Sequence, residues 1–142
     1  RRMLKYRYVM VENNLDKIDK IEMKSPDEIL MEKIINIINE NISNPELSVE
    51  MLADSVGMSR VHIHRKLKEL TDLAPRDFIK SLRLKQAGVL LQEKRLTIAE
   101  VAYAVGYSNP SYFSNSFREY YALSPKEFMT RANEKRENSH QN

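Results

Sequence analysis

Apolar residues recur every three or four positions along most of the chain, and no convincing stretch alternates with a period of two. This spacing predicts α-helices, because one face of a helix repeats every 3.6 residues. The first clear helix begins at Ser25-Pro26, which places a capping serine before a proline at the first helical position. Its apolar face comprises Leu30, Ile34, Ile37, Ile38 and Ile42. The pattern as a whole predicts an all-α protein with about seven helices.

The chain contains an internal repeat. The segment LAPRDFI, residues 73 to 79, recurs 50 residues later as LSPKEFM, residues 123 to 129. Upstream of each copy lies a short amphipathic segment that opens on a residue suited to cap a helix, Ser48 in the first copy and Thr97 in the second. Glu100 stands three positions after Thr97, which completes the capping-box pattern. The repeat therefore includes at least one short helix in each copy.

A turn and a second helix follow in both copies. Each short helix ends at a glycine, Gly57 or Gly106, as helices do where the backbone turns left-handed. Ser59 caps the next helix of the first copy, and Asn109 followed by proline caps that of the second. The apolar faces of these second helices correspond: Ile63, Leu67 and Leu70 in one copy; Phe113, Phe117 and Tyr120 in the other. Two helices joined by a glycine turn indicate a helix-turn-helix, here present twice.

The polar faces of the two second helices, which we call the reading helices, carry the candidate chemistry. Residues 59 to 70 hold four basic residues against one acid, Glu69. The candidate DNA contacts of this helix are Arg60, Val61, His62, His64, Arg65, Lys66 and Lys68. Those of the second are Asn109, Ser111, Tyr112, Ser114, Asn115 and Arg118. Such side chains can contact base edges in a major groove. A solvated polar face is the alternative, and for the second helix the residues alone leave both interpretations open.

One long helix is predicted between the two copies. About 20 residues span roughly 30 Å in a helix, and successive major grooves on one face of DNA lie about 34 Å apart. One chain could therefore bring two reading helices to one duplex. The expected organisation starts with a linker or the tail of a preceding domain at 1–24 and a helix-turn-helix subdomain at 25–74. The connecting helix follows at 75–95, and a second such subdomain, with a C-terminal helix and disordered tail, at 96–142.

Composition narrows the function classes. The 142 residues include no cysteine, which excludes disulfides and thiolate metal sites and favours the cytoplasm. His62 and His64 are two positions apart and point to different sides of a helix, so we expect no metal site. The absence of a nucleophile with a base partner and of a glycine-rich phosphate loop predicts no enzyme activity, cofactor or small-molecule ligand. The net charge of +3 permits DNA binding without requiring it.

Three long motifs together resemble the DNA-binding domain of the AraC/XylS family of bacterial transcription regulators: LADSVGMSRVHIHRKLKEL, APRDFIKSLRLKQAGVLL and TIAEVAYAVGYSNPSYFSNSFREYYALSPKEFM. The resemblance covers about residues 26 to 132 and implies two helix-turn-helix units joined by a long helix. It implies base contacts mainly from Val61, His64 and Arg65, and second-helix contacts at Pro110, Ser111, Ser114 and Asn115. The chain departs from the family's usual Phe, Gly and Phe at Tyr107, Ala122 and Leu67, which are packing substitutions.

The opening stretch through NPELS is also similar to the output end of hybrid two-component sensors of Bacteroides-type gut bacteria. On that resemblance, RRMLKYRY would be the tail of a receiver domain's last helix. Because the chain opens on Arg1 rather than methionine, we expect a piece of a longer protein. The full-length protein would then be anchored in the inner membrane, with this piece in the cytoplasm.

The expected function is sequence-specific binding of double-stranded DNA by a bacterial transcription regulator, with two reading helices in successive major grooves. The alternative is a helical protein-interaction module that uses the tyrosine-rich second unit to contact RNA polymerase or a receiver domain in the same chain. RNA is a poorer partner because its deep, narrow major groove does not admit these helices.

Overall fold

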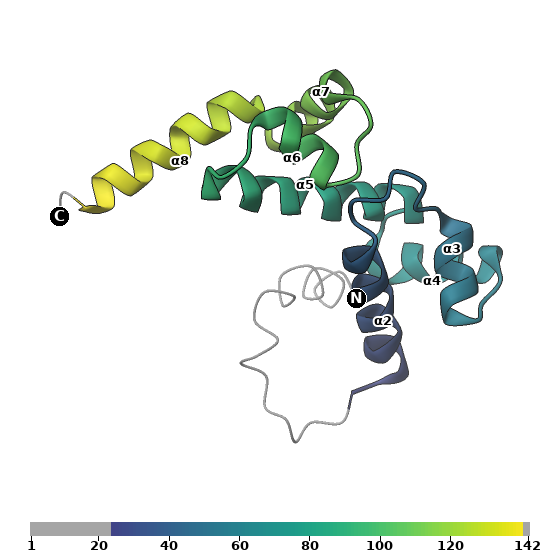
Figure 1. Cartoon of the computed structure of the whole chain (residues 1–142). Helices are drawn as coiled ribbons and strands as arrows, with labels where there is room; N and C mark the ends of the chain where they lie inside the picture. The colour runs from purple at the N-terminus through teal and green to yellow at the C-terminus, as the bar shows by residue number, and fades with distance from the viewer. Residues whose placement is uncertain (1–23, 141–142) are drawn as a thin grey trace. The chain divides into compact units, whose positions relative to one another are not determined.

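The computed structural model describes residues 24 to 140, and this part of the chain contains helices and no strand (Figure 1). The helices are α2 (Pro26–Glu40), α3 (Val49–Val56), α4 (Arg60–Thr71), α5 (Pro75–Glu93), α6 (Ile98–Ala104), α7 (Pro110–Tyr121) and α8 (Pro125–His140). The prediction of an all-α fold is confirmed. The linker or receiver tail predicted at residues 1–24 lies, apart from Lys24, outside the described residues. None of the described helices is long and apolar enough to cross a membrane.

The predicted helix caps are confirmed. The side chains of Ser48, Ser59 and Thr97 each accept a hydrogen bond from the backbone N–H three residues further on, at 3.1 to 3.3 Å. Glu100 completes the capping box, because its carboxylate accepts from the N–H of Thr97 at 2.9 Å. The Oδ1 atom of Asn109 accepts from the two N–H groups that open α7. Each such cap stabilises a helix by about 1 kcal/mol, so the starts of α3, α4, α6 and α7 are fixed by local sequence.

The repeat extends to backbone hydrogen bonds. The N–H of Met58 donates to the carbonyl of Ala53 at 3.0 Å, and 49 residues later the N–H of Tyr107 donates to that of Ala102 at 2.9 Å. Gly57 and Gly106 both have positive φ, of 68° and 90°. From Gly57 the next cap is two residues away, whereas from Gly106 it is three, so the second turn is one residue longer.

The chain divides into two compact units. Of the described residues, unit 1 comprises those up to Glu40 together with Leu47–Ile79, and unit 2 comprises Asn41–Glu46 and those from Lys80 onward. The division falls within α5, which contributes its first turn to unit 1 and the remainder to unit 2.

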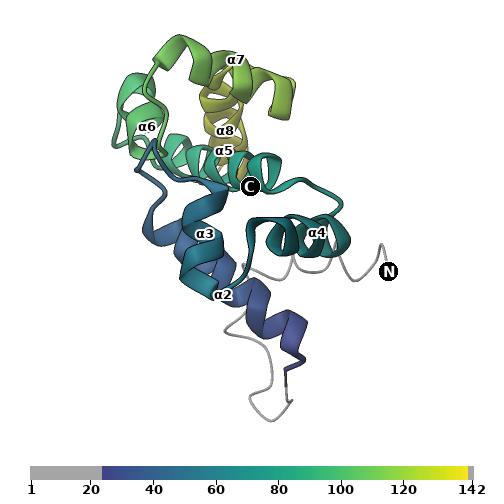
Figure 2. The same ribbon diagram turned by 90° about the vertical axis from the view of Figure 1, so that its right-hand side faces the viewer.

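Unit 1 has a core of aliphatic side chains. Helix α3 packs against both α2 and α4 (Figure 2). The apolar face predicted for α4 is confirmed, because Ile63, Leu67 and Leu70 are at most 5% exposed. The other buried side chains of this unit are Met31, Ile34, Ile38, Leu47, Leu52, Ala53, Phe78 and Ile79. With its inner face fully occupied, α4 has only its opposite face available to a partner.

Unit 2 has an aromatic core. Phe113 and Phe117 of α7 are fully buried and their ring centroids lie 5.7 Å apart. The third aromatic position was predicted wrongly: Tyr120 is 45% exposed, and Tyr121 packs on Phe117 instead, at 4.4 Å between centroids. The Tyr121 hydroxyl donates to the carbonyl of Leu84 in α5 at 2.9 Å. The rest of this core comprises Leu84, Ala87, Leu91, Val101, Ala102, Val105 and Tyr107.

Candidate nucleic-acid interface

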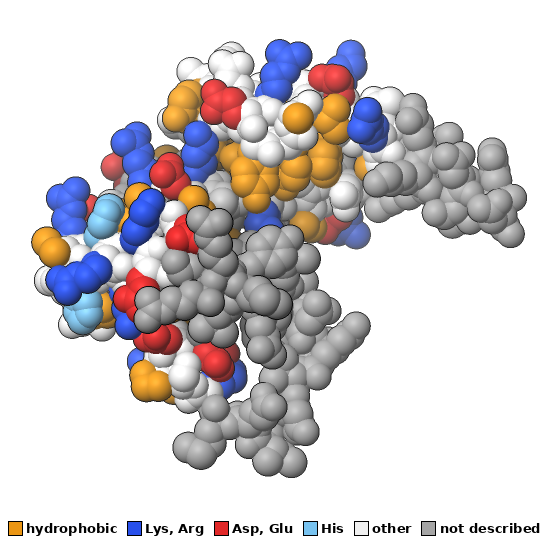
Figure 3. Space-filling view, turned by 180° about the vertical axis from the view of Figure 1, so that it is seen from behind, with side chains coloured by type: hydrophobic (Ala, Val, Ile, Leu, Met, Phe, Trp, Pro, Cys, Tyr) orange, Lys and Arg blue, Asp and Glu red, His pale blue; other side chains and the backbone are white. Residues whose placement is uncertain are grey.

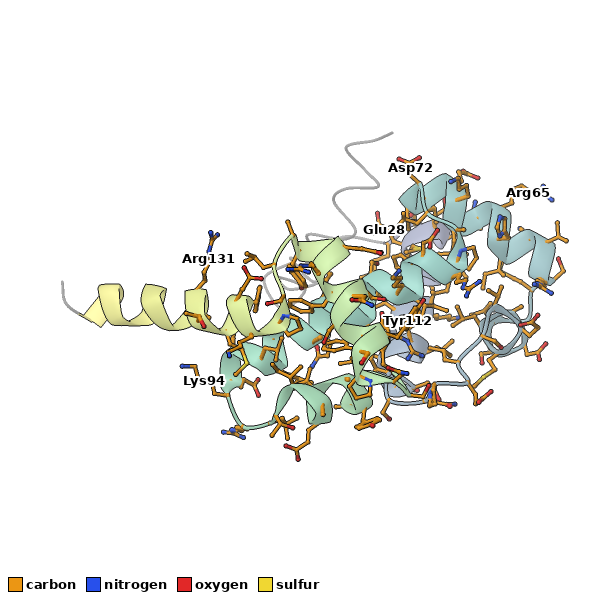
Figure 4. The ribbon with its side chains drawn as sticks, turned by 90° about the horizontal axis from the view of Figure 1, so that it is seen from above. Glu28, Arg65, Asp72, Lys94, Tyr112 and Arg131 are labelled. Atoms are coloured by element: carbon orange, nitrogen blue, oxygen red, sulfur yellow. The ribbon has the colours of Figure 1, made fainter. Side chains whose placement is uncertain are left out.

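Helix α4 exposes the residues that the sequence selected. Arg60, Val61, His62, His64, Arg65 and Lys68 are all exposed, and only Lys66 is half-buried. Val61 is 69% exposed, although it is aliphatic. Arg65 points outward from α4 (Figure 4). In the space-filling view, the two pale-blue histidines of α4 stand among blue Lys and Arg side chains (Figure 3). The structure therefore exposes six of the seven candidates on α4, spread over the sides of the helix that do not face the core.

Three of the four cations of α4 have protein partners. The Nζ atom of Lys66 lies 3.0 Å from Oδ1 of Asp27, and this hydrogen bond raises the pKa of Lys66. Arg60 lies 2.9 Å from the Glu50 carboxylate. Lys68 donates to the carbonyl of Asp72 at 3.1 Å, at the C-terminal end of the helix, where a cation is favoured. Arg60, Lys66 and Lys68 therefore have intramolecular partners in the absence of DNA.

Arg65 differs from the other three. Within residues 24 to 132, where side chains are described, it has no hydrogen bond or ion pair with another side chain. A planar guanidinium can bond O6 and N7 of guanine together. Arg65 is therefore the cation of α4 that base recognition can use without breaking an intramolecular pair.

The acidic partners of α4 were missed by sequence reasoning. Glu50 lies in the same helix-turn-helix, and the hydrogen bond to its own backbone N–H, followed by the charge of Arg60, lowers its pKa. Asp27 lies in α2, 39 positions before Lys66, and no local pattern connects the two. Lys66 as a DNA contact stays a prediction, and Asp27 would compete with DNA for its ammonium group.

Helix α7 exposes a different set of groups. Asn109, Ser111, Tyr112, Asn115 and Arg118 are exposed, and Ser114 is half-buried. Tyr112 is 58% exposed and lies against the ring of Tyr107, with 5.8 Å between centroids. Asn109 is occupied as the cap of α7 through its Oδ1 atom, which leaves its amide N–H₂ group to donate.

The charge on α7 is small. Arg118 is its one basic residue, and Glu119 follows directly, within 4.0 Å of Lys80 of α5. The face consists of hydroxyl, amide and ring groups, which can bond bases but attract phosphate weakly. The two reading helices therefore occupy equivalent positions in the repeat but expose different kinds of side chain.

The turn before α7 is held by a residue that the sequence did not reveal. Arg83 of α5 is only 7% exposed, and it donates to the carbonyl of Val105 at 3.0 Å and to that of Asn44 at 2.8 Å. Burial lowers its pKa. The only signal in the sequence is a cation between Leu82 and Leu84, both of which are buried.

Residues 52–131 match the family of helix-turn-helix domains. The protein named histidine kinase P4 of Formosa agariphila is 32% identical over 115 residues, which are 81% of this chain and 8% of that protein. The first curated relatives are all much longer, and this chain spans between 8% and 38% of their length.

Two solved structures have the same fold. One is a transcriptional regulator of Chromobacterium violaceum with an AraC-type DNA-binding domain: the TM-score is 0.70 and the identity 26%, over 77% of this chain and 96% of that one. The other is the DNA-binding domain of AdpA in complex with a target DNA: the TM-score is 0.68 and the identity 28%, over 75% of this chain and 95% of that one.

Proposed function

Because the chain belongs to the family of helix-turn-helix domains, we propose that its two units bind double-stranded DNA together, with α4 and α7 in successive major grooves. The activity itself is that of an AraC-type domain: sequence-specific duplex binding in the control of transcription. In this chain, the exposed residues of α4 and α7 suit different contacts with DNA.

The observation that carries the proposal is the outer face of α4. Its inner face is buried completely, and its outer face presents Arg65, which is unpaired among the described side chains, beside the 69% exposed Val61. A guanidinium suits guanine, and an aliphatic group suits the methyl group of thymine. Arg60 and Lys68 flank these two and suit phosphates, which position a helix without specifying sequence.

Helix α7 is proposed as the second reading helix. Asn115 occupies the place equivalent to Arg65, and an asparagine side chain can bond adenine at N6 and N7. The 19 residues of α5, the helix that both units share, span roughly 28 Å, and adjacent grooves are about 34 Å apart. This length supports simultaneous binding by one chain.

The proposal is tested by selecting bound duplexes from a random pool and measuring affinity for the selected site at several salt concentrations. If about six phosphates are contacted, log K against log salt should have a slope near −5. A duplex of the same composition but scrambled order is the control and should bind more weakly at every concentration. A slope near zero, or equal binding of both duplexes, would contradict DNA recognition.

The same proposal extends to the longer protein. The similarity to histidine kinase P4 covers 81% of this chain and supports a role as the output domain of a two-component regulator. A receiver domain encoded directly upstream of residue 1 is the expected finding. A different preceding domain would contradict this part of the proposal without affecting DNA binding.

A further inference from the structure

Arg83 is a buried cation whose described partners are backbone carbonyls. Its guanidinium donates to Val105 and Asn44, and among the described residues no carboxylate pairs with it. Burying a charge is unfavourable unless hydrogen bonds compensate for the lost water. Here the hydrogen bonds to the two carbonyls supply that compensation, and they tie both carbonyls to α5.

The first of these carbonyls lies at the turn that leads into α7. Val105 is the C-terminal cap of α6, and its carbonyl has no further turn of helix to bond. Three residues separate it from Asn109, the cap of α7, so a displaced Val105 carbonyl changes how α7 begins. The second carbonyl, of Asn44, belongs to residues 41–46, which are part of the same unit.

The guanidinium of Arg83 leaves no room for a side chain at Gly106. Gly106 follows Val105 with φ of 90°, and a Cβ atom there would collide with Nη1 of Arg83 and with the carbonyl oxygen of Ile42. Glycine at this position lets Arg83 approach the turn. Its planar donors reach two acceptors at once, which a lysine ammonium on a flexible stem reproduces only in part.

We propose that Arg83 is a positioning residue for DNA recognition by unit 2: by bonding the carbonyls of Val105 and Asn44 it fixes the α6–α7 turn, and through it the base-reading face of α7. The inference rests on the proposed function, and it assigns to a buried residue of α5 a part in half-site recognition without contact with DNA.

The test compares three duplexes: the selected site, the site with only the half read by α7 scrambled, and a fully scrambled duplex. Affinities are measured for the wild-type chain, Arg83→Met and Arg83→Lys, at a temperature at which circular dichroism shows each variant folded. Gln86→Met is the matched control, because it places the same side chain at an exposed position of the same helix and unit.

For Arg83→Met we expect about a tenfold loss of affinity for the selected site, the scale of one hydrogen bond to a charged group. Its binding to the half-scrambled duplex should equal that of the wild type. The affinity of Arg83→Lys for the selected site should lie between those of Arg83→Met and the wild type. Gln86→Met should keep the wild-type ratio of the affinities for the selected and half-scrambled duplexes. If Arg83→Met does not fold, the Arg83→Lys ratio decides the question.

Two outcomes overturn the inference. Variants that melt at a lower temperature but keep the wild-type ratio would show that Arg83 only stabilises unit 2. A wild-type chain that binds the selected and half-scrambled duplexes equally would show that α7 reads no bases. Failure of the proposed function differs from both, because the wild-type chain would then not distinguish even the fully scrambled duplex.

Discussion

At the scale of single residues, the cations of α4 differ in what they already bind. Lys66 is paired with Asp27 and Arg60 with Glu50, whereas Arg65 is unpaired among the described side chains. Helical spacing was sufficient to place Arg65 and Lys68 opposite the buried face, and both are exposed. It could not show the pair with Asp27, which depends on how α2 packs on α4.

Arg65→Ala should therefore relax base preference at one position of the selected motif and weaken binding by about 1–3 kcal/mol, the scale of a bidentate arginine–guanine pair. Lys68→Ala is the control, since loss of a phosphate contact should weaken all sequences alike. Repeating the selection with each variant measures both effects. An unchanged motif for Arg65→Ala would show that another residue of α4 reads that base.

The two turn glycines provide a second comparison at this scale. Both have positive φ, but a Cβ on Gly57 would meet nothing within 4 Å, whereas one on Gly106 would collide with Arg83. Gly57→Ala should lower the free energy of unfolding by about 1–2 kcal/mol through backbone strain alone. Gly106→Ala should lower it by about 3 kcal/mol or more, because overpacking adds to strain. If urea unfolding shows that both variants lose the same free energy of unfolding, the Arg83 side chain moves aside at little cost.

At the scale of elements, the packing of α7 shows where local sequence stops being sufficient. Phe113 and Phe117 were predicted in the core and are there, since a four-residue spacing keeps them on one face. Tyr120 and Tyr121 are neighbours in sequence, and helical spacing places both of them near the next position on that face. Contacts with α5 favour Tyr121: Gly88 leaves room for its side chain, and its hydroxyl donates a hydrogen bond to the carbonyl of Leu84. Which tyrosine is buried therefore depends on tertiary packing, and the repeat alone predicted the wrong one.

The placement of Tyr121 makes the stability of unit 2 depend on alkaline pH. Burial, together with the neighbouring Tyr120, raises the pKa of Tyr121 to about 12, against about 10 when unfolded. The folded chain therefore holds this proton more tightly, and the resulting stability is complete below pH 10 and is lost as pH rises through 12.

Tyr121→Phe isolates this contribution, since every other group titrates in both proteins. Near pH 8 the variant should be less stable by about 1 kcal/mol, because it lacks the hydrogen bond to Leu84. Between pH 10 and 12 the difference should shrink and then reverse sign, because the unfolded wild-type chain ionises this phenol while the folded chain still holds the proton. Urea unfolding of both proteins across this pH range measures the difference in the free energy of unfolding. A difference that stays constant to pH 12 would contradict the assigned packing of Tyr121.

At the scale of the whole molecule, the internal repeat was readable because its signals are local: caps, glycines and the spacing of apolar residues. The sequence could not show that residues 41–46 belong to unit 2, although they lie between two helices of unit 1. That assignment involves contacts distant in sequence, such as the packing of Ile42 on the unit 2 core and the hydrogen bond from Arg83 to Asn44. The second unit is also the one whose outer face is nearly neutral. We expect its half-site to be read more weakly, with degenerate positions in the selected motif.

Changing the spacing between the two half-sites tests most directly whether both units read one duplex. Five inserted base pairs turn one half-site to the opposite face of the helix, since a full turn takes about 10 base pairs. The affinity of the wild-type chain for this duplex should fall to that for the site with one half scrambled, because α4 and α7 could no longer bind together. Full affinity after the insertion would contradict the account: only unit 1 would then engage DNA, and the second copy of the repeat would serve packing or a protein partner.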